Sequence, residues 1–311
     1  MDLIKYDINF SLNPVGFNNI GFTCYYNSLL QSLLSCTSFV EELIAHKDEQ
    51  DGLIKLLNYL IDKLTKLDDP SFEHHEIYYN EISNLGPITW KYMVNRIAKK
   101  SMNFSYMASG QQCAAEGFSL LLQSIEEYHN IQNLFLYRRR NKLYCEDCKN
   151  YFSQIDEMNN IFEVEPHEIE TKSFSKNLNE FLLNQKNNVD SNCRCSKCGT
   201  KSEKQKTSTL VMVPEILFVM AKKYKYNNGQ SEKLDIYTDF PEILTFNAKK
   251  NTKLIYRAVA QIEHIGNSIH SGHYYAICKR KNKWYCINDT HVSEAEFKPT
   301  NNTYIVIYHI F

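Results

Sequence analysis

Two Cys-x2-Cys pairs lie near the middle of this 311-residue chain and place the strongest constraint on its fold. Cys145 and Cys148 lie in LYCEDCKNYF, and Cys195 and Cys198 lie in CRCSKCGTK. Four thiolates at this spacing bind one Zn²⁺ tetrahedrally, with each pair forming a tight turn between strands. The pairs are 47 positions apart (195 − 148), so a shared ion would join two distant hairpins. We therefore expect one structural zinc site that performs no chemistry.

Cys193 leaves an alternative open at the second pair, since it could replace one ligand or remain idle. Gly199 follows Cys198, as in many zinc knuckles, and favours Cys195 and Cys198 as the ligands. The remaining alternative, scattered buried thiols, requires two coincidental pairs. Ten cysteines could also form disulfides, but five fall in the two clusters and the opening MDLIKYDINF has no secretory pattern. We expect a reducing compartment, cytoplasmic or nuclear.

Hydrophobic periodicity divides the chain into two parts. Residues 24 to about 130 show apolar residues at three- and four-residue steps, which predicts helices. Strand-like runs such as KLIYRAVAQIEHI and TYIVIYHIF dominate from about residue 134, interrupted by one helical pattern, FSKNLNEFLLNQ. The pattern KYNNGQSEK predicts an exposed hairpin end or loop, and the basic run YRRRNK predicts a solvated loop. A helical half followed by a strand-rich half indicates an α+β fold with a cleft between the halves.

Charge and hydropathy argue against two classes of partner. The formal net charge is −1, and the chain has no continuous basic aromatic face, so we expect no nucleic-acid partner. The longest apolar candidate, LVMVPEILFVMA, contains Pro214 and Glu215 and is too short to span a bilayer. We therefore expect no membrane partner.

Cys24 follows a turn rich in Gly and Asn, GFNNIGFTC, at the point where a helical pattern begins. Leu29 and Leu33 continue that pattern, and Thr23 is placed to cap the helix that Cys24 opens. The partial positive charge of a helix N-terminus favours a thiolate over a thiol, as a nucleophile requires. Cys36, inside the apolar stripe, is expected to belong to the core.

A cysteine nucleophile needs a base, and the base needs an orienting partner. Among ten histidines, His273 stands out because Gly272 precedes it and an alternating strand follows, in SGHYYAICKRKNKWYCIND. Gly272 would let the backbone approach a ligand closely, and the strand would fix the imidazole. The next strand ends in Asn288 and Asp289, either of which could accept the imidazole N–H. His309, within an apolar strand, is expected to be a satisfied core histidine.

Three stretches together resemble one family, the ubiquitin-specific proteases, which are papain-like cysteine peptidases that remove ubiquitin. GFNNIGFTCYYNSLLQSL is similar to the family's cysteine box, SGHYYAICKRKNKWYCINDTHV to its histidine box, and TYIVIYH to its closing strand. QQCAAEGF is similar to the motif between the boxes, and both cysteine pairs fall where the family has zinc knuckles. The resemblance extends from about residue 14 to residue 311.

The resemblance implies an α+β fold shaped like a hand. Residues 1–15 would be a lead-in, and residues 16–311 would form a single catalytic domain. A helical thumb would cover about 16–133, zinc-tipped β fingers about 134–215, and an antiparallel β palm mainly 216–311. The fingers would hold ubiquitin, free or attached to a protein, while its C-terminal tail lies in the thumb–palm cleft. We expect a monomer.

The resemblance also assigns roles in deubiquitination. Cys24 would attack the carbonyl carbon of the terminal glycine of ubiquitin, and His273 would act as general base and then acid. Asn288 matches the third position of the triad, and Asp289 matches the adjacent position that sometimes shares this role. Asn19, five residues before Cys24, matches the side chain that donates a hydrogen bond to the oxyanion.

The motif QQCAAEGF departs from the family at one position. Gln112 and Glu116 match residues that bind the substrate, but Cys113 stands where the family has an aspartate. That aspartate pairs with an arginine of the ubiquitin tail, and a thiol cannot form this charge-assisted hydrogen bond. We expect weaker binding of the ubiquitin tail, or a preference for a ubiquitin-like modifier with a less basic tail, unless another acidic residue takes over. Cys113 lacks a nearby base and is not expected to be a second nucleophile.

Two other classes compete with a deubiquitinase. A ubiquitin-binding module with weak or no catalysis would not need Cys24, His273 and Asn288 together. A zinc-ribbon protein that binds nucleic acid would have closer cysteine pairs and a more basic surface. Both therefore fit the sequence less well than the enzyme does.

Overall fold

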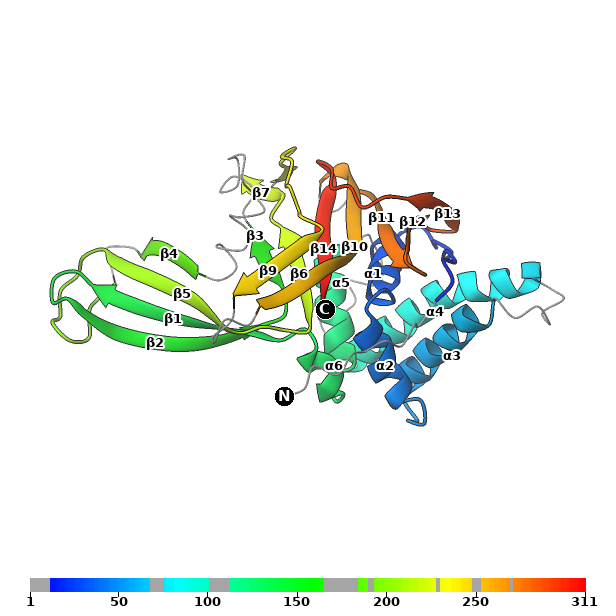
Figure 1. Cartoon of the computed structure of the whole chain (residues 1–311), viewed down its shortest axis with the longest axis horizontal. Helices are drawn as coiled ribbons and strands as arrows, with labels where there is room; N and C mark the ends of the chain where they lie inside the picture. Colours follow the sequence, from blue (N-terminus) through cyan, green and yellow to red (C-terminus); the bar gives the residue numbers. More distant parts are fainter. Residues whose placement is uncertain are drawn as a thin grey trace.

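The computed structural model describes residues 12–67, 75–100, 112–164, 184–189, 193–227, 230–247, 253–268 and 271–311. Helices occupy one end of the molecule, a large sheet lies in the centre, and a long narrow sheet extends from the other end (Figure 1). This arrangement confirms the α+β prediction. The described helices are α1 (Cys24–Leu33), α2 (Thr37–Ala45), α3 (Gly52–Lys66), α4 (His75–Lys100), α5 (Ala114–Ser124) and α6 (His129–Asn133).

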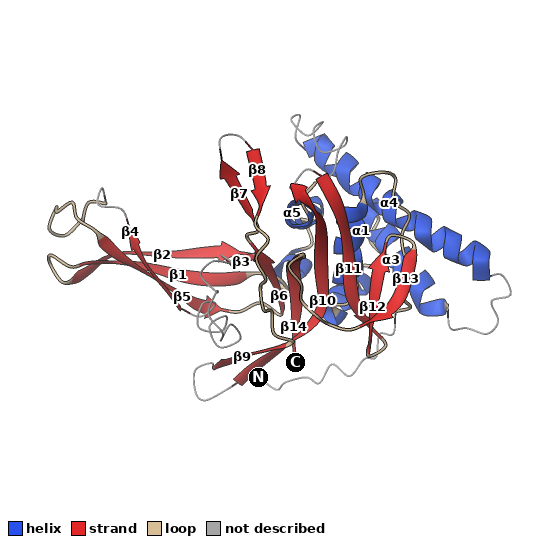
Figure 2. Ribbon diagram, turned by 90° about the horizontal axis from the view of Figure 1, so that it is seen from above, coloured by secondary structure: helices blue, strands red, loops and turns tan. Residues whose placement is uncertain are grey.

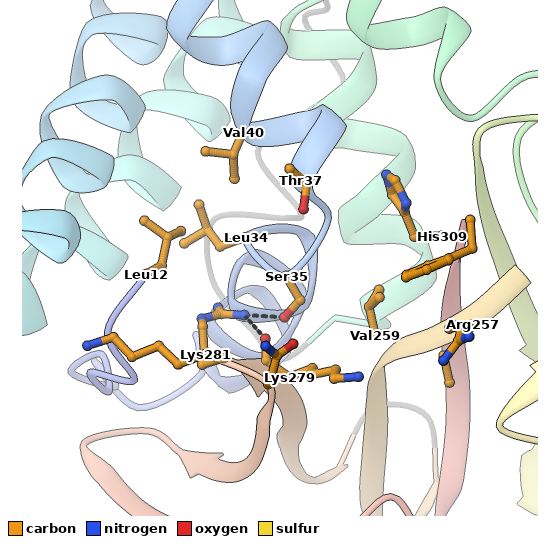
Figure 3. Close-up of a pocket in the computed structure, with 14 residues that line it drawn as sticks. Leu12, Leu34, Ser35, Thr37, Val40, Arg257, Val259, Lys279, Lys281 and His309 are labelled. Atoms are coloured by element: carbon orange, nitrogen blue, oxygen red, sulfur yellow. Dashed lines mark hydrogen bonds between the residues drawn. The ribbon is translucent and has the colours of Figure 1, made fainter. Parts of the chain in front are cut away.

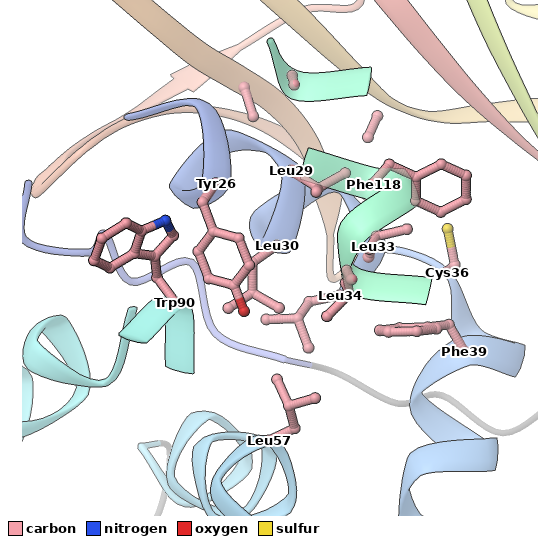
Figure 4. Packing of buried hydrophobic residues seen from close by; sticks show 14 of the residues in the cluster. Tyr26, Leu29, Leu30, Leu33, Leu34, Cys36, Phe39, Leu57, Trp90 and Phe118 are labelled. Atoms are coloured by element: carbon pink, nitrogen blue, oxygen red, sulfur yellow. The ribbon is translucent and has the colours of Figure 1, made fainter. Parts of the chain in front are cut away.

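Helix α1 is the centre of the helical part, and all ten of its residues are buried. Leu29, Leu30 and Leu33 contribute to one cluster with Trp90 from α4 and Phe118 from α5 (Figure 4). The opposite side of α1 packs against strand β11 of the central sheet. A helix that carries a reactive group is thus fixed by apolar contacts on several sides, which limits its movement.

The central sheet has eight strands among the described residues, in the order β13-β12-β11-β10-β14-β6-β3, with β9 paired to β10. Every pair is antiparallel except β3 with β6. A stacked ring pair with centroids 4.2 Å apart, Phe118 and Phe218, joins the helices to this sheet. Its strands are β3 (Phe162–Val164), β6 (Ile216–Ala221), β9 (Ile243–Asn247), β10 (Lys253–Ser268), β11 (Ser271–Arg280), β12 (Lys283–Asn288), β13 (His291–Ala295) and β14 (Thr303–Ile310).

The narrow sheet has the order β2-β1-β5-β4 and projects away from the helices (Figure 2). A separate hairpin pairs β7 with β8, as the pattern KYNNGQSEK predicted. These strands are β1 (Tyr137–Cys145), β2 (Asn150–Asn159), β4 (Asn184–Val189), β5 (Lys204–Met212), β7 (Tyr224–Asn227) and β8 (Gln230–Lys233).

Four local predictions are wrong or need correction. YRRRNK is not a solvated loop but the start of β1, because Tyr137, Arg139 and Asn141 form its buried face. The predicted helix FSKNLNEFLLNQ lies outside the described residues up to position 183, and its last two residues begin strand β4. Thr23 precedes α1, but its side chain does not cap the helix. The helical pattern expected up to about residue 130 is interrupted near its end, because a turn after Ser124 separates α5 from α6.

In the described part of the chain, no helix is both long and apolar enough to cross a bilayer.

Candidate active site and metal centre

Cys24 is the first residue of α1 and is 3% exposed. No side chain caps this helix, since the Thr23 hydroxyl accepts a hydrogen bond from the Ile20 N–H at 3.3 Å. The N–H groups of the first turn are therefore not occupied by a capping side chain, and their partial positive charge acts on the thiol. The N-terminus of α1 is suited to hold a thiolate or an oxyanion.

His273 lies on β11, against which α1 packs, and is the hydrogen-bonding partner of Cys24. This hydrogen bond is the largest influence on the imidazole and raises its pKa. Burial acts in the opposite direction, but the hydrogen bond to Asn288 and the negative charges of Cys24 and Asp289 add to the increase, and the pKa reaches about 9. The site therefore favours a protonated imidazole beside the sulfur at neutral pH.

Asn288 and Asp289 hold different positions relative to the base. His273 Nε2 lies 2.5 Å from Asn288 Oδ1, whereas it lies 3.9 Å from Asp289 Oδ2. Asn288 therefore accepts the imidazole N–H, which leaves Nδ1 for the thiol. Asp289 contributes charge from a greater distance. The geometry favours Asn288 as the third member of the triad.

Asp289 organises the turn before the nucleophile. The Asn19 amide donates to Asp289 Oδ2 at 2.9 Å, and the Asn27 amide donates to Asp289 Oδ1 at 3.0 Å. The carbonyl of Asn19 accepts the backbone N–H of Gly21 at 2.9 Å and of Thr23 at 3.1 Å. The turn is thus held at both ends of the Asn19 side chain, and the second N–H of its amide has no acceptor among the described residues.

Asn27 is a residue of this site that the sequence analysis missed. It lies one turn after Cys24 on α1, is 3% exposed, and donates to Asp289 from within an apolar helix. A buried amide at this position in CYYNSLL is the signal that could have revealed it, since buried polar groups need partners.

The predicted substrate-binding residues lie on two elements. Gln112 is buried, two residues before α5, and Glu116 is exposed on the first turn of that helix. Gly272, with φ of +147°, precedes His273, and a Cβ there would come within 2.4 Å of the Ile265 carbonyl oxygen on β10. The neighbouring strand therefore requires this glycine. Contact of these residues with a substrate remains a prediction.

Cys113 immediately precedes α5, is 4% exposed, and lies 2.9 Å from the Tyr304 hydroxyl. Burial raises the pKa of its thiol, so the sulfur remains neutral. Tyr224 and Tyr274 also face this region, and the pKa values of their hydroxyls are raised, first by burial. The position that would be acidic in the family is therefore an uncharged contact between a thiol and a phenol.

The structure brings together the four cysteines predicted to bind metal. The sulfurs of Cys145, Cys148, Cys195 and Cys198 lie within 4.8 Å of one another, and Cys193 is not part of this group. They lie at the far end of the narrow sheet, where β1 turns into β2 (Figure 1).

Nearby groups support this arrangement. The Lys197 N–H points to Cys195 Sγ at 3.4 Å, and the Thr200 hydroxyl lies 3.0 Å from Cys198 Sγ. Asp147 accepts from Thr200 at 2.9 Å and from the buried Lys204 at 3.3 Å. Four soft sulfur donors of this kind fit Zn²⁺, and the surrounding donors would stabilise their negative charge.

Both ring nitrogens of His309 have partners, as predicted, because Nε2 lies 2.7 Å from the Ser38 hydroxyl and Nδ1 lies 2.8 Å from the Ile310 carbonyl oxygen. The residue is half-buried, however, and does not belong to the core.

Comparisons with known proteins show which family the chain resembles. The family model described as Ubiquitin carboxyl-terminal hydrolase matches residues 15–308. Ubiquitin carboxyl-terminal hydrolase 12 of Salmo salar is 26% identical, and the match covers 93% of this chain and 84% of that protein. Ubl carboxyl-terminal hydrolase 18 of Homo sapiens is 24% identical, with 93% and 80% covered. Ubiquitin carboxyl-terminal hydrolase 26 of Arabidopsis thaliana is 23% identical over 93% of this chain, which spans only 27% of that longer relative.

Solved structures show the same fold. One is a chain of the SAGA Ubp8/Sgf11/Sus1/Sgf73 DUB module bound to ubiquitin aldehyde, with a TM-score of 0.75 and 20% identity over 98% of this chain and 71% of that chain. The same module bound to monoubiquitin gives a TM-score of 0.74, also at 20% identity, over 98% and 70%.

Proposed function

Because this chain belongs to the ubiquitin carboxyl-terminal hydrolase family, the cysteine deubiquitinases, we propose that it cleaves the bond after the C-terminal glycine of ubiquitin. The observation that carries the proposal is the placement of Cys24 at the N-terminus of a buried helix that packs against β11, where His273 Nε2 lies 2.5 Å from Asn288 Oδ1. A non-catalytic binding module would not need this arrangement.

The reaction follows from the positions of these groups. The Cys24 thiolate attacks the carbonyl carbon, and the resulting oxyanion accepts hydrogen bonds from the Asn19 amide and the N-terminus of α1. His273 then donates its proton to the leaving lysine amine, which leaves a thioester on Cys24. The neutral imidazole then accepts a proton from water, and the resulting hydroxide attacks the carbonyl carbon of the thioester. This step releases ubiquitin with a free carboxylate and restores the Cys24 thiolate. Asn288 holds the imidazole in the orientation that both steps need.

The four-cysteine cluster would hold one Zn²⁺ and fix the end of the narrow sheet. This ion would stabilise the fold and takes no part in the reaction. All ten cysteines are free thiols, which accords with our proposal that the protein works in a reducing compartment, cytoplasmic or nuclear.

A ubiquitin-like modifier is a second candidate substrate, favoured by the neutral contact of Cys113 with Tyr304. An acidic residue at that position would pair with a basic tail, and the thiol removes this advantage. The relatives that match this chain include proteins named Ubiquitin carboxyl-terminal hydrolase and one named Ubl carboxyl-terminal hydrolase, so the matches do not decide between the two substrates.

A ubiquitin probe with a C-terminal thiol-reactive group tests the proposal. The wild type and Cys113→Ala should form an adduct, and Cys24→Ala should not. If folded, zinc-loaded wild type forms no adduct with ubiquitin, the same experiment with ubiquitin-like probes separates the second candidate from a binding module. Failure with every probe would overturn the proposed activity.

A further inference from the structure

A cavity of about 440 Å³ lies on the side of the molecule where the loop between α1 and α2 meets β10, β11 and the end of β14 (Figure 3). Four of the fourteen lining residues carry positive charge, and none is an Asp or Glu. The nearby carboxylate of Glu215 lies 3.9 Å from His309 Nε2 but does not line the cavity. The side-chain charges that line the cavity are therefore all positive.

Arg280 is the central observation, because this residue lines the cavity although it is only 3% exposed. Nη1 donates to the hydroxyl of Ser35 and to the Lys279 carbonyl at 3.1 Å, and Nη2 donates to the Gln31 carbonyl at 2.7 Å. All these acceptors are neutral, and Nε has no acceptor. Among the described residues no carboxylate pairs with Arg280, which is unusual for a buried charge.

Helix α2 adds to the positive potential. Ser35 and Thr37 line the cavity at the N-terminus of this helix, which has no side-chain cap and no acidic residue in its first turn. The first N–H groups of such a helix, together with nearby hydroxyls, form a site for anions.

Three further cations surround the cavity. Lys281 donates to Asn13 Oδ1 at 2.6 Å, and Arg257 lies over the ring of Phe311, 4.3 Å from its centroid. Lys279 is half-buried and forms no side-chain hydrogen bond or ion pair within the ranges that the structure describes. It is therefore available to a ligand.

We propose that this cavity, around Arg280, Lys279 and the N-terminus of α2, binds a small molecule that carries phosphate. The donors that a phosphate would find here are Lys279, the first N–H groups of α2 and the Thr37 hydroxyl. Arg280, whose Nη groups already donate to Ser35, Lys279 and both oxygens of Gln31, adds positive charge behind them. The cavity is larger than one phosphate and falls within the size range of small-molecule sites. Leu12, Leu34 and Val40 supply an apolar wall for the remainder of such a molecule (Figure 3). The proposal is independent of the catalytic one, since its readouts are binding and stability.

Calorimetric titration and thermal denaturation of the full chain at constant ionic strength test this inference, with inorganic phosphate, pyrophosphate and chloride as probes. Pyrophosphate should bind more tightly than phosphate and raise the Tm, whereas chloride should not. Lys279→Gln should weaken pyrophosphate binding by about fivefold or more, as loss of a charged hydrogen bond predicts. Lys279→Glu should abolish it.

Lys91→Gln is the matched control, because Lys91 is an exposed, unpaired lysine of α4 among the described residues and does not line the cavity. It should bind pyrophosphate as the wild type does. Equal effects of phosphate and chloride, or equal binding of pyrophosphate by Lys279→Gln and the wild type, would overturn the proposal.

Discussion

The Asn19 side-chain amide donates a hydrogen bond to the Asp289 carboxylate at 2.9 Å, across 270 positions of sequence. This contact joins the turn before the nucleophile to the residue after Asn288, so the proposed oxyanion donor and the proposed triad share one support. Asp289 adopts a positive φ of +49°, and its backbone carbonyl accepts the Phe17 N–H at 2.9 Å. Asp289 is therefore a positioning residue for the turn as well as a source of charge near His273.

We expect Asn19→Ala and Asp289→Ala to be non-additive. Asn19→Ala should lower kcat about 100-fold, as for other oxyanion donors, with little change in KM. Asp289→Ala should lower kcat about tenfold, because Asn19 loses its support. The double variant should lose clearly less than the product of the two effects. Steady-state hydrolysis of a ubiquitin C-terminal fluorogenic amide measures all three, and full additivity would show that the contact does not position Asn19.

The pKa of His273, about 9, should fall when either of its hydrogen-bonding partners is removed. Cys24→Ala should lower it most, because the hydrogen bond to Cys24 is the largest cause of the increase. Asn288→Ala should lower it less, and it should also reduce kcat. After both losses burial favours the neutral imidazole, and only the charge of Asp289 still opposes it. NMR titration of the His273 ring measures the change, and a pKa that is the same in all variants would contradict this arrangement of the site.

Removing one ligand of the metal cluster should destabilise the fold without touching the nucleophile. Cys198→Ser should reduce bound zinc from one equivalent toward none and lower the Tm by about 5 °C or more. Cys193→Ser is the matched control and should keep both the zinc and the Tm, because Cys193 is not in the cluster. Metal analysis and calorimetry provide the readouts. Loss of zinc from Cys193→Ser would show that the ligand set is different.

Cys113→Asp should restore a charged partner for a basic tail. We expect kcat/KM on a ubiquitin substrate to rise about tenfold, since a hydrogen bond to a charged group replaces a neutral one. Cys113→Ser, which is polar but uncharged, should change kcat/KM little. A parallel assay on a ubiquitin-like substrate shows whether the preference changes. If aspartate brings no gain on ubiquitin, another acidic residue already serves the tail.

His264 should make the fold less stable as the pH falls. It is fully buried, and burial, with smaller effects from Lys233 and His273, lowers its pKa to about 4. An unfolded histidine has a pKa of about 6.5, so between these values the unfolded chain binds a proton that the folded chain does not. The free energy of unfolding should therefore decrease by about 1.4 kcal/mol per pH unit as the pH falls from 6.5 to 4. Urea denaturation of the wild type and of His264→Gln at a series of pH values measures this dependence. The free energy of unfolding should fall more steeply with decreasing pH in the wild type, and an equal pH dependence in both proteins would refute the assignment.

The sequence predicted correctly which elements carry Cys24 and His273, because short local patterns determine both positions. Cys24 begins α1 and His273 lies on β11 after Gly272, as the turn and strand signals indicated. The four cysteines meet because their spacing reflects one metal geometry. Predictions of this kind depend only on neighbouring residues in the sequence and not on contacts with distant parts of the chain.

The failures have a common cause in long-range pairing. YRRRNK looks like a loop by composition, yet Arg139 is buried beside the Phe162 ring, 5.1 Å from its centroid, and pairs with residues of β5 far along the chain. The aliphatic part of an arginine can cover an aromatic ring, and that contact is invisible in a local pattern. Asn27 was missed for the same reason, since its partner Asp289 is 262 positions away.

Strand β14 lies between β10 and β6 in the middle of the central sheet, although it is the last strand along the chain. The sheet that carries His273 therefore remains divided until residues 303–310 insert and join its two sides. A substitution that weakens β14 should therefore loosen both sides of this sheet, although neither Cys24 nor His273 lies on that strand.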